Sequence, residues 1–177
     1  RDPLLGQWLP IAERDDSMIP AAVEFLREHG VLDAPERVGS AWIRLAGQTR
    51  SSSSATALTR WLLDAKRGAS SRVAALRALE AISPADFAES LALVLGDPAD
   101  AVRAASLGVL MRIDPDRALP YLQTAVRGNR EERRAAFAAL ASHPAPAAEE
   151  LLGSELARYR DGLVPAEVGL ELVEACE

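Results

Sequence analysis

Residues 83–113 contain two runs in which apolar side chains recur every three or four positions. The first run is Phe87, Leu91, Val94 and Leu95, and the second is Val102, Ala105, Leu107, Leu110 and Met111. This spacing predicts two amphipathic helices, with Gly96 ending the first of them. Since two helices with one apolar stripe each cannot cover both stripes alone, similar helix pairs are expected on either side.

The same pattern recurs along the chain at an interval of about thirty residues. Arg72, Leu76 and Leu79 are followed at equivalent positions by Arg103, Leu107 and Leu110, then by Arg133, Phe137 and Leu140, and more weakly by Val168, Leu170 and Val173. Partner helices are expected at 55–66, 84–95, 115–127 and 145–160. The chain should therefore form about ten or eleven helices in about five pairs.

Several residue pairs predict where these helices begin. An N-cap residue stands before proline, which suits the first helical turn, at Ser83-Pro84, Asp97-Pro98 and Asp114-Pro115. The spacing of a capping box occurs at Asp33 with Glu36 and at Asn129 with Glu132. Pro120 lies more than one turn into its helix, where it predicts a kink or a later helix start.

The first third of the chain has a less regular pattern. A short helix is expected over 2–13, a second from 15–17 to a stop at His29-Gly30, and a third ending near Gly47. The serine run 51–54 fits either a flexible linker or a loop with an N-cap. The loop is preferred, because an apolar helical pattern follows at once.

Composition agrees with an all-α fold. Hydrophobic residues make up 49% of the sequence but aromatic residues only 5%, and alternating β-branched runs are absent. The net charge of −6 argues against a general nucleic-acid binder, since phosphate affinity requires clustered positive charge. No apolar run approaches the roughly 20 residues that span a bilayer, so no direct membrane insertion is expected.

A helix that ends before an Asp-Pro turn, with Val-Arg and small residues after it, resembles the HEAT repeat. Residues 95–98 (LGDP) and 102–105 (VRAA) carry the resemblance. It implies a right-handed α-α superhelix forming one domain over 1–177, with Asp97 and Arg103 in a ladder between neighbouring repeats. The ladder should be incomplete, because Asn129 replaces the aspartate before Arg133 and no arginine follows Glu167.

Residues 71–177 are also similar to the helical segment of planctomycete-type membrane-bound dehydrogenases. In that family a β-propeller precedes such a segment and a c-type cytochrome domain follows it. The resemblance implies a fragment of an exported or periplasmic protein, in which the segment joins the two domains. Heme c is then expected only in a downstream domain, since Cys176 is the sole cysteine and no Cys-x-x-Cys-His motif occurs.

No catalytic, cofactor-binding or metal-ligating residues are predicted. His29 and His143 stand at helix ends, where capping is expected rather than metal binding. Cys176 lacks a nearby histidine, so an inert thiol is expected. The tryptophans fall on apolar stripes and are assigned to the core: Trp8, Trp42 and Trp61.

One basic group is a candidate partner surface. It consists of Arg127, Arg130, Arg133 and Arg134. These side chains either dock an anion or acidic partner, or pair with neighbouring glutamates and the turn between repeats. The sequence leaves both interpretations open.

Three function hypotheses follow. The first is a non-catalytic scaffold or interaction module that binds a protein partner or flanking domains, with weak self-association through terminal helices. The second is a HEAT-like DNA glycosylase, which would require a basic concave groove with exposed tryptophan and aspartate. The third is a free-standing HEAT adaptor of another complex.

Overall fold

The computed structural model describes residues 18–143 and 145–177, and these residues are all-helical, which confirms the predicted fold class. Ten α-helices occur in them: α1 (Met18–Glu28), α2 (Glu36–Gln48), α3 (Ala55–Leu63), α4 (Ala69–Ile82), α5 (Phe87–Val94), α6 (Asp100–Ile113), α7 (Pro115–Ala125), α8 (Arg130–Ala141), α9 (Pro146–Arg160) and α10 (Gly169–Ala175). Short 3₁₀ helices occupy Val31–Asp33, Ser52–Ser54 and Ala166–Val168. The helix expected over 2–13, including Trp8, lies outside the described residues, as does the expected cap at 15–17.

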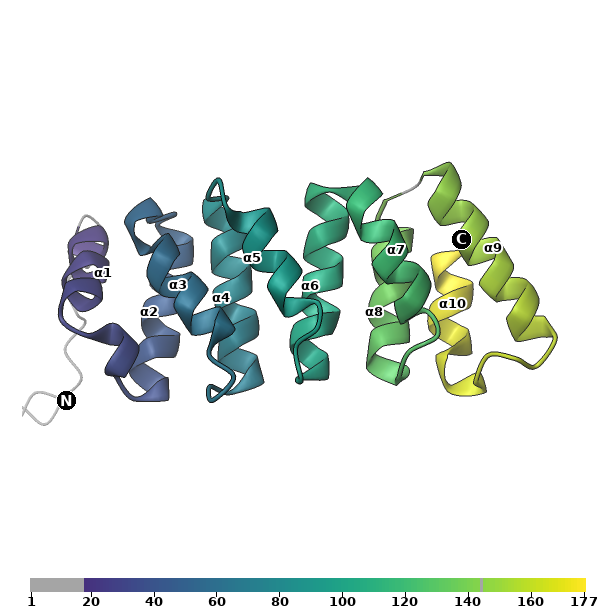
Figure 1. Ribbon diagram of the computed structural model, residues 1–177, viewed down its shortest axis with the longest axis horizontal. Coiled ribbons are helices and arrows are strands. Elements are labelled where there is room, and N and C mark those ends of the chain that lie inside the picture. Colours follow the sequence, from purple (N-terminus) through teal and green to yellow (C-terminus); the bar gives the residue numbers. More distant parts are fainter. Residues whose placement is uncertain (1–17, 144) are drawn as a thin grey trace, which may run out of the picture.

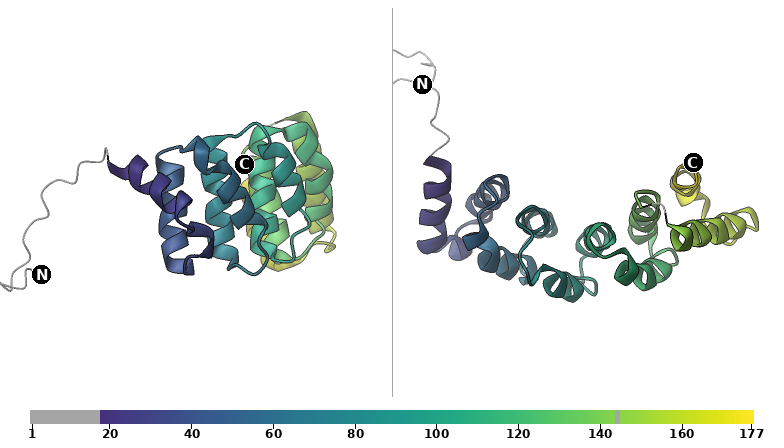
Figure 2. Two further views of the ribbon diagram at one scale, coloured as in Figure 1. Left: turned by 60° about the vertical axis from the view of Figure 1, so that its left-hand side comes forward. Right: turned by 90° about the horizontal axis from the view of Figure 1, so that it is seen from above.

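The helices form two rows (Figure 1). We call α2, α4, α6, α8 and α10 the inner row and α3, α5, α7 and α9 the outer row. Viewed from above, the two rows curve into an arc whose concave side is formed by the inner row (Figure 2). Successive inner helices contact one another, and α1 packs on α2 at the N-terminal end.

The core lies between the rows and follows the predicted register. The paired positions of three successive inner helices are at most 5% exposed, namely Leu76 and Leu79, Leu107 and Leu110, and Phe137 and Leu140. The prediction for the last copy is wrong in part, because Val168 is buried whereas Leu170 is 68% exposed. Val173 is also exposed, at 41%, and the face towards the core is formed by Val168, at the end of the 3₁₀ helix, and Leu172 of α10.

Trp42 and Trp61 are fully buried, which confirms their core assignment. The indole nitrogen of Trp42 donates to the Val23 carbonyl at 3.0 Å, and that of Trp61 donates to the Ser71 hydroxyl at 3.2 Å. The guanidinium of Arg67 lies 3.6 Å from the Trp61 ring centroid and covers its outer side. Both rings thereby satisfy their one polar group within the core.

Two predicted helix starts are confirmed. Asp114 caps α7 by accepting from the Arg117 amide at 3.1 Å, so α7 begins at Pro115 and not near Pro120. Asn129 and Glu132 form the predicted reciprocal capping box of α8, with both bonds at 3.0 Å. In both cases all the atoms that form the cap lie within one helical turn.

The prediction that Ser83-Pro84 starts a helix is wrong. Ser83 adopts a left-handed conformation with φ of 52° and ends α4, where its amide donates to the Leu79 carbonyl at 2.7 Å. Helix α5 begins only at Phe87. A residue that favours an N-cap here serves as a C-cap, because α4 continues to Ile82, directly before it, and α5 begins four residues later.

Two helix caps predicted in the first third of the chain do not form. Helix α2 begins at Glu36 with Pro35 before it, and Asp33 belongs to a 3₁₀ turn, so no capping box forms. The serine run is not a flexible linker, since Ser52–Ser54 is helical and Ser54 is buried, but Ser54 makes no side-chain cap. The expected stop after α1 is confirmed by Gly30, whose φ is 88°.

Candidate functional site

Arg72, at the start of α4, is bound on two sides. Its Nε donates to the Leu62 carbonyl at 2.7 Å, which fixes it to the end of α3. Its two terminal nitrogens donate to the two carboxylate oxygens of Asp97, with Nη1 and Oδ1 3.0 Å apart. Arg72 and Asp97 are almost fully buried, so this pair joins the α3–α4 helix pair to the turn between α5 and α6.

The Asp97 carboxylate also organises the start of α6. Its Oδ1 accepts from the Ala99 amide at 2.9 Å, and α6 begins at Asp100. The prediction that a helix opens at Asp97-Pro98 is therefore wrong by two residues. Burial alone would raise the pKa of the Asp97 carboxyl, but the hydrogen bonds from Arg72 and Ala99, with the charges of Arg72 and Arg103, outweigh it and lower that pKa.

Arg103 occupies the position in α6 that Arg72 occupies in α4. It donates to the main-chain carbonyl of Asp97, so the two residues of the expected ladder touch, although the Asp97 carboxylate binds Arg72. The other contacts of Arg103 are to Glu132, with Nε 2.7 Å from Oε1, and to Asp100 at 2.5 Å. The contact with Glu132 joins α6 to α8, one helix pair further along.

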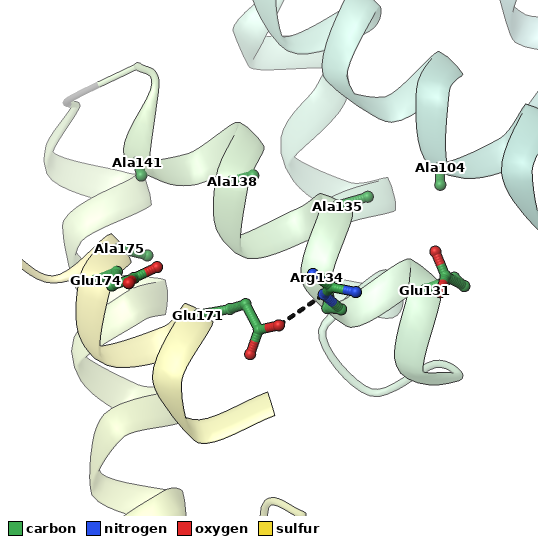
Figure 3. A pocket seen from close by; sticks show the side chains of 9 residues that line it. All are labelled: Ala104, Glu131, Arg134, Ala135, Ala138, Ala141, Glu171, Glu174 and Ala175. Atoms are coloured by element: carbon green, nitrogen blue, oxygen red, sulfur yellow. Dashed lines mark ion pairs between the residues drawn. The ribbon is translucent and has the colours of Figure 1, made fainter. Parts of the chain in front are cut away.

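Arg133, the third equivalent arginine, binds only the turn that precedes its own helix. It donates to the Gly128 carbonyl at 2.8 Å and to the Arg127 carbonyl at 3.3 Å. No acidic side chain of the described residues contacts it. The next link is made instead by Arg134, whose Nε lies 2.6 Å from Glu171 on α10 (Figure 3).

The candidate basic group is thus divided by the structure. Arg133 is used by the turn and Arg134 by the ion pair with Glu171. Arg127 and Arg130 are exposed, and their side chains make no hydrogen bond or ion pair within the described residues. The predicted ladder does not include Arg72. Its spacing of thirty-one residues from Arg103 marks the equivalent position one repeat earlier, and this spacing could have identified it.

Three neighbouring grooves, which we together call the concave trough, lie along the inner row. One of about 520 Å³ lies between α2 and α4, and one of about 480 Å³ lies over α4, α6 and α8. The third, of about 570 Å³, lies over α6, α8 and α10 and is drawn in Figure 3. Arg77 lines the first two grooves, and Ala104, Ala135 and Ala138 line the last two. No outer-row residue lines them, so the trough opens on the concave side.

Many side chains on the floor of the trough are small, and its charged side chains are unevenly distributed. The small side chains include Ala74, Ala81, Ala104, Ala105, Gly108, Ala135, Ala138 and Ala141. Arg44 and Arg77 flank the N-terminal groove. Arg112 and Glu80 form an ion pair in the middle, with nitrogen–oxygen distances of 2.7 and 3.0 Å.

The C-terminal end of the trough has the opposite charge. Glu131, Glu171 and Glu174 line it together with Arg134, so acidic residues exceed basic residues by two (Figure 3). Within the described residues Glu131 and Glu174 have no ion-pair partner. Sequence analysis did not identify this trough, because the residues that line it come from five separate helices.

The two histidines and the cysteine all lie just after the C-terminal ends of helices. Nδ1 of His29 is 2.7 Å from the Phe25 carbonyl, at the end of α1, and His143 follows the end of α8. Cys176 is exposed after α10, and partial burial of its sulfur raises the pKa of the thiol, which works against nucleophilic chemistry. Within the described residues no hydrogen bond joins any two of the three.

Residues 18–143 and 145–177 contain no cluster of three or more histidine, cysteine, aspartate or glutamate side chains placed to ligate a metal ion. None of their helices combines the length and the apolar character needed to cross a bilayer. Comparison of the chain with known protein families, characterised proteins and solved structures finds no match.

Proposed function

We propose that the chain is a non-catalytic protein-interaction module built as a HEAT-like right-handed superhelix. In its parent protein it would join a β-propeller dehydrogenase domain to a c-type cytochrome domain. The observation that carries the proposal is the arginine ladder, in which Arg72 binds the end of α3 and Arg103 binds the turn before α6. Each of the two also binds an acidic residue of the next helix pair. Such links serve to fix the spacing of successive helix pairs.

A fixed spacing suits a connector between two redox domains. In repeat proteins each unit contacts only its neighbours, so the length of the array depends on those contacts. The buried Arg72–Asp97 pair and the Arg103–Glu132 pair oppose shear between three successive inner helices. The ends of the array would therefore remain at a set distance while the concave side stays open to a partner.

The lining of the trough distinguishes a DNA glycosylase from a protein-interaction module. A DNA glycosylase would require exposed tryptophan and aspartate in a basic groove, whereas Trp42 and Trp61 are buried and the described lining contains neither residue type. The glutamates at its C-terminal end would repel phosphate. These features favour a protein partner, and a free-standing adaptor would use the same surface.

The proposal is tested on the parent gene product and on its domains. A propeller encoded upstream of Arg1 and a Cys-x-x-Cys-His motif downstream of Glu177 are expected. The separately expressed flanking domains should then bind the 177-residue chain in titration calorimetry. A parent protein without either domain would refute the connector role, and failure of both domains to bind would refute the interaction role.

A further inference from the structure

We propose that the concave trough binds a linear protein segment that is acidic at one end and basic at the other. The acidic end would lie over α2 and α4, and the basic end over α8 and α10. This inference rests on the proposed interaction function and specifies its surface, its partner chemistry and the direction of binding.

The shape of the trough suits an extended chain. Each groove shares lining residues with its neighbour, so the three grooves follow one another across five inner helices. The floor of alanine and glycine leaves room for a partner backbone to approach the helices closely. With helix axes about 8–10 Å apart, the trough is roughly 32–40 Å long, which an extended segment of about 10–12 residues covers.

The charge of the trough changes from basic to acidic along its length. Arg44 and Arg77 are exposed at the α2–α4 end, and no hydrogen bond or ion pair of the described residues involves their side chains. The middle groove adds no net charge beyond Arg77, which it shares with the first groove, because Arg112 and Glu80 compensate each other.

The α8–α10 end is acidic. Arg134 is compensated by Glu171, and Glu131 and Glu174 are left without a cation among the described residues. A partner with the opposite order of charge is attracted at both ends, whereas the reversed orientation brings like charges together.

The lining of the trough favours a protein segment over a nucleic acid. The basic groove is also lined by Val73 and Ala74, which are partly exposed and favour contact with aliphatic side chains. A nucleic acid carries one sign of charge along its whole length, so attraction at Arg44 and Arg77 would be opposed by Glu131 and Glu174. Only a chain that changes sign along its length fits both ends.

The test uses a synthetic peptide of about fourteen residues, with four glutamates, six alanine or leucine residues and four arginines in that order. A second peptide has the same composition but alternating charges. The ordered peptide should bind the intact chain more tightly in a fluorescence titration. The double substitution Arg44→Glu with Arg77→Glu should weaken that binding by about tenfold or more.

The matched control is Arg60→Glu with Arg117→Glu, on the outer-row helices α3 and α7. It makes the same change of net charge at exposed arginines that do not line the trough, so the affinity should not change. Equal binding of the two peptides, or equal loss in the two double variants, would overturn the proposal. Either result would mean that net charge alone controls the association.

The direction of binding is read from Cys176, the single cysteine of the sequence, which adjoins the trough residue Ala175. A nitroxide attached there should broaden the NMR signals of the arginine end of the peptide and spare the glutamate end. Broadening of the glutamate end would overturn the proposed direction. If the ordered peptide does not bind but a flanking domain does, the trough proposal fails and the interaction function stands.

Discussion

Arg72 and Asp97, which are twenty-five residues apart in sequence, form a bidentate ion pair with side chains only 2% and 7% exposed. Each partner has a further contact that orients it, from Arg72 to the Leu62 carbonyl and from the Ala99 amide to Asp97. The pair therefore connects one helix pair to the next through fully satisfied polar groups. Its energetic role follows from this burial, because a buried charge that loses its partner is costly.

Removal of one partner should destabilise the protein strongly. We expect Asp97→Ala to reduce the free energy of unfolding by about 3–5 kcal/mol, since the Arg72 charge would remain buried without a counter-ion. Urea denaturation followed by circular dichroism measures this change. The double variant Arg72→Met with Asp97→Leu should recover much of the loss, and Glu80→Ala, at the more exposed ion pair with Arg112, should cost less than about 1 kcal/mol.

The same pair predicts an acid-dependent stability. Because the pKa of Asp97 is lower in the folded protein than its ordinary value, the carboxylate adds stability above the unfolded-state pKa of about 3.9. This contribution should disappear as the pH falls through the lower folded-state pKa. Unfolding free energies measured from pH 7 to pH 2 should show the loss, and the Asp97→Asn variant should show a smaller slope. An equal slope in the variant would contradict the assignment.

The core register predicts a second large effect. Leu107 is 5% exposed, so Leu107→Ala should cost about 2–5 kcal/mol of unfolding free energy. Leu93 on α5 is 68% exposed, and Leu93→Ala should change the value by less than about 0.5 kcal/mol. Thermal melting of both variants compares the sites, and an unchanged midpoint for Leu107→Ala would refute the register.

Two glycines within helices should respond oppositely to alanine. A Cβ atom at Gly39 would overlap the Trp61 ring, so Gly39→Ala should destabilise by about 1–3 kcal/mol through overpacking. Gly153 in α9 has nothing near its Cβ position, so Gly153→Ala should stabilise by up to about 1 kcal/mol through helix propensity. Differential scanning calorimetry should show midpoints shifted in opposite directions.

The terminal helices predict concentration-dependent association. Leu156 and Val173 line one groove at the C-terminal end and are 37% and 41% exposed, while Phe25 on α1 is 58% exposed. Sedimentation velocity over a wide concentration range should show weak self-association. The substitutions Leu156→Glu and Val173→Glu together should abolish it, whereas Leu93→Glu, on the outer row, should not. A strict monomer at every concentration would contradict this prediction.

The sequence by itself determined most of the helices, most of the core and two of the local caps, those of α7 and α8. The three-to-four-residue period assigned Leu107, Leu110 and Phe137 to the buried face, because burial of one stripe is imposed along the whole helix. The capping box of Asn129 and Glu132 was also readable, since all its atoms belong to one turn. Ser83 could not be assigned correctly, because its role depended on where α4 stopped.

Only the tertiary structure decided which distant polar groups meet. Asp97 has Arg103 at the expected spacing, yet its carboxylate binds Arg72, because the packing of α4 beside α6 brings that guanidinium to the turn. The apolar period identifies the buried side of each helix but not which exposed residues of separate helices converge. The charge order of the concave trough arises from the side-by-side alignment and curvature of the inner helices, which no local pattern of residues encodes.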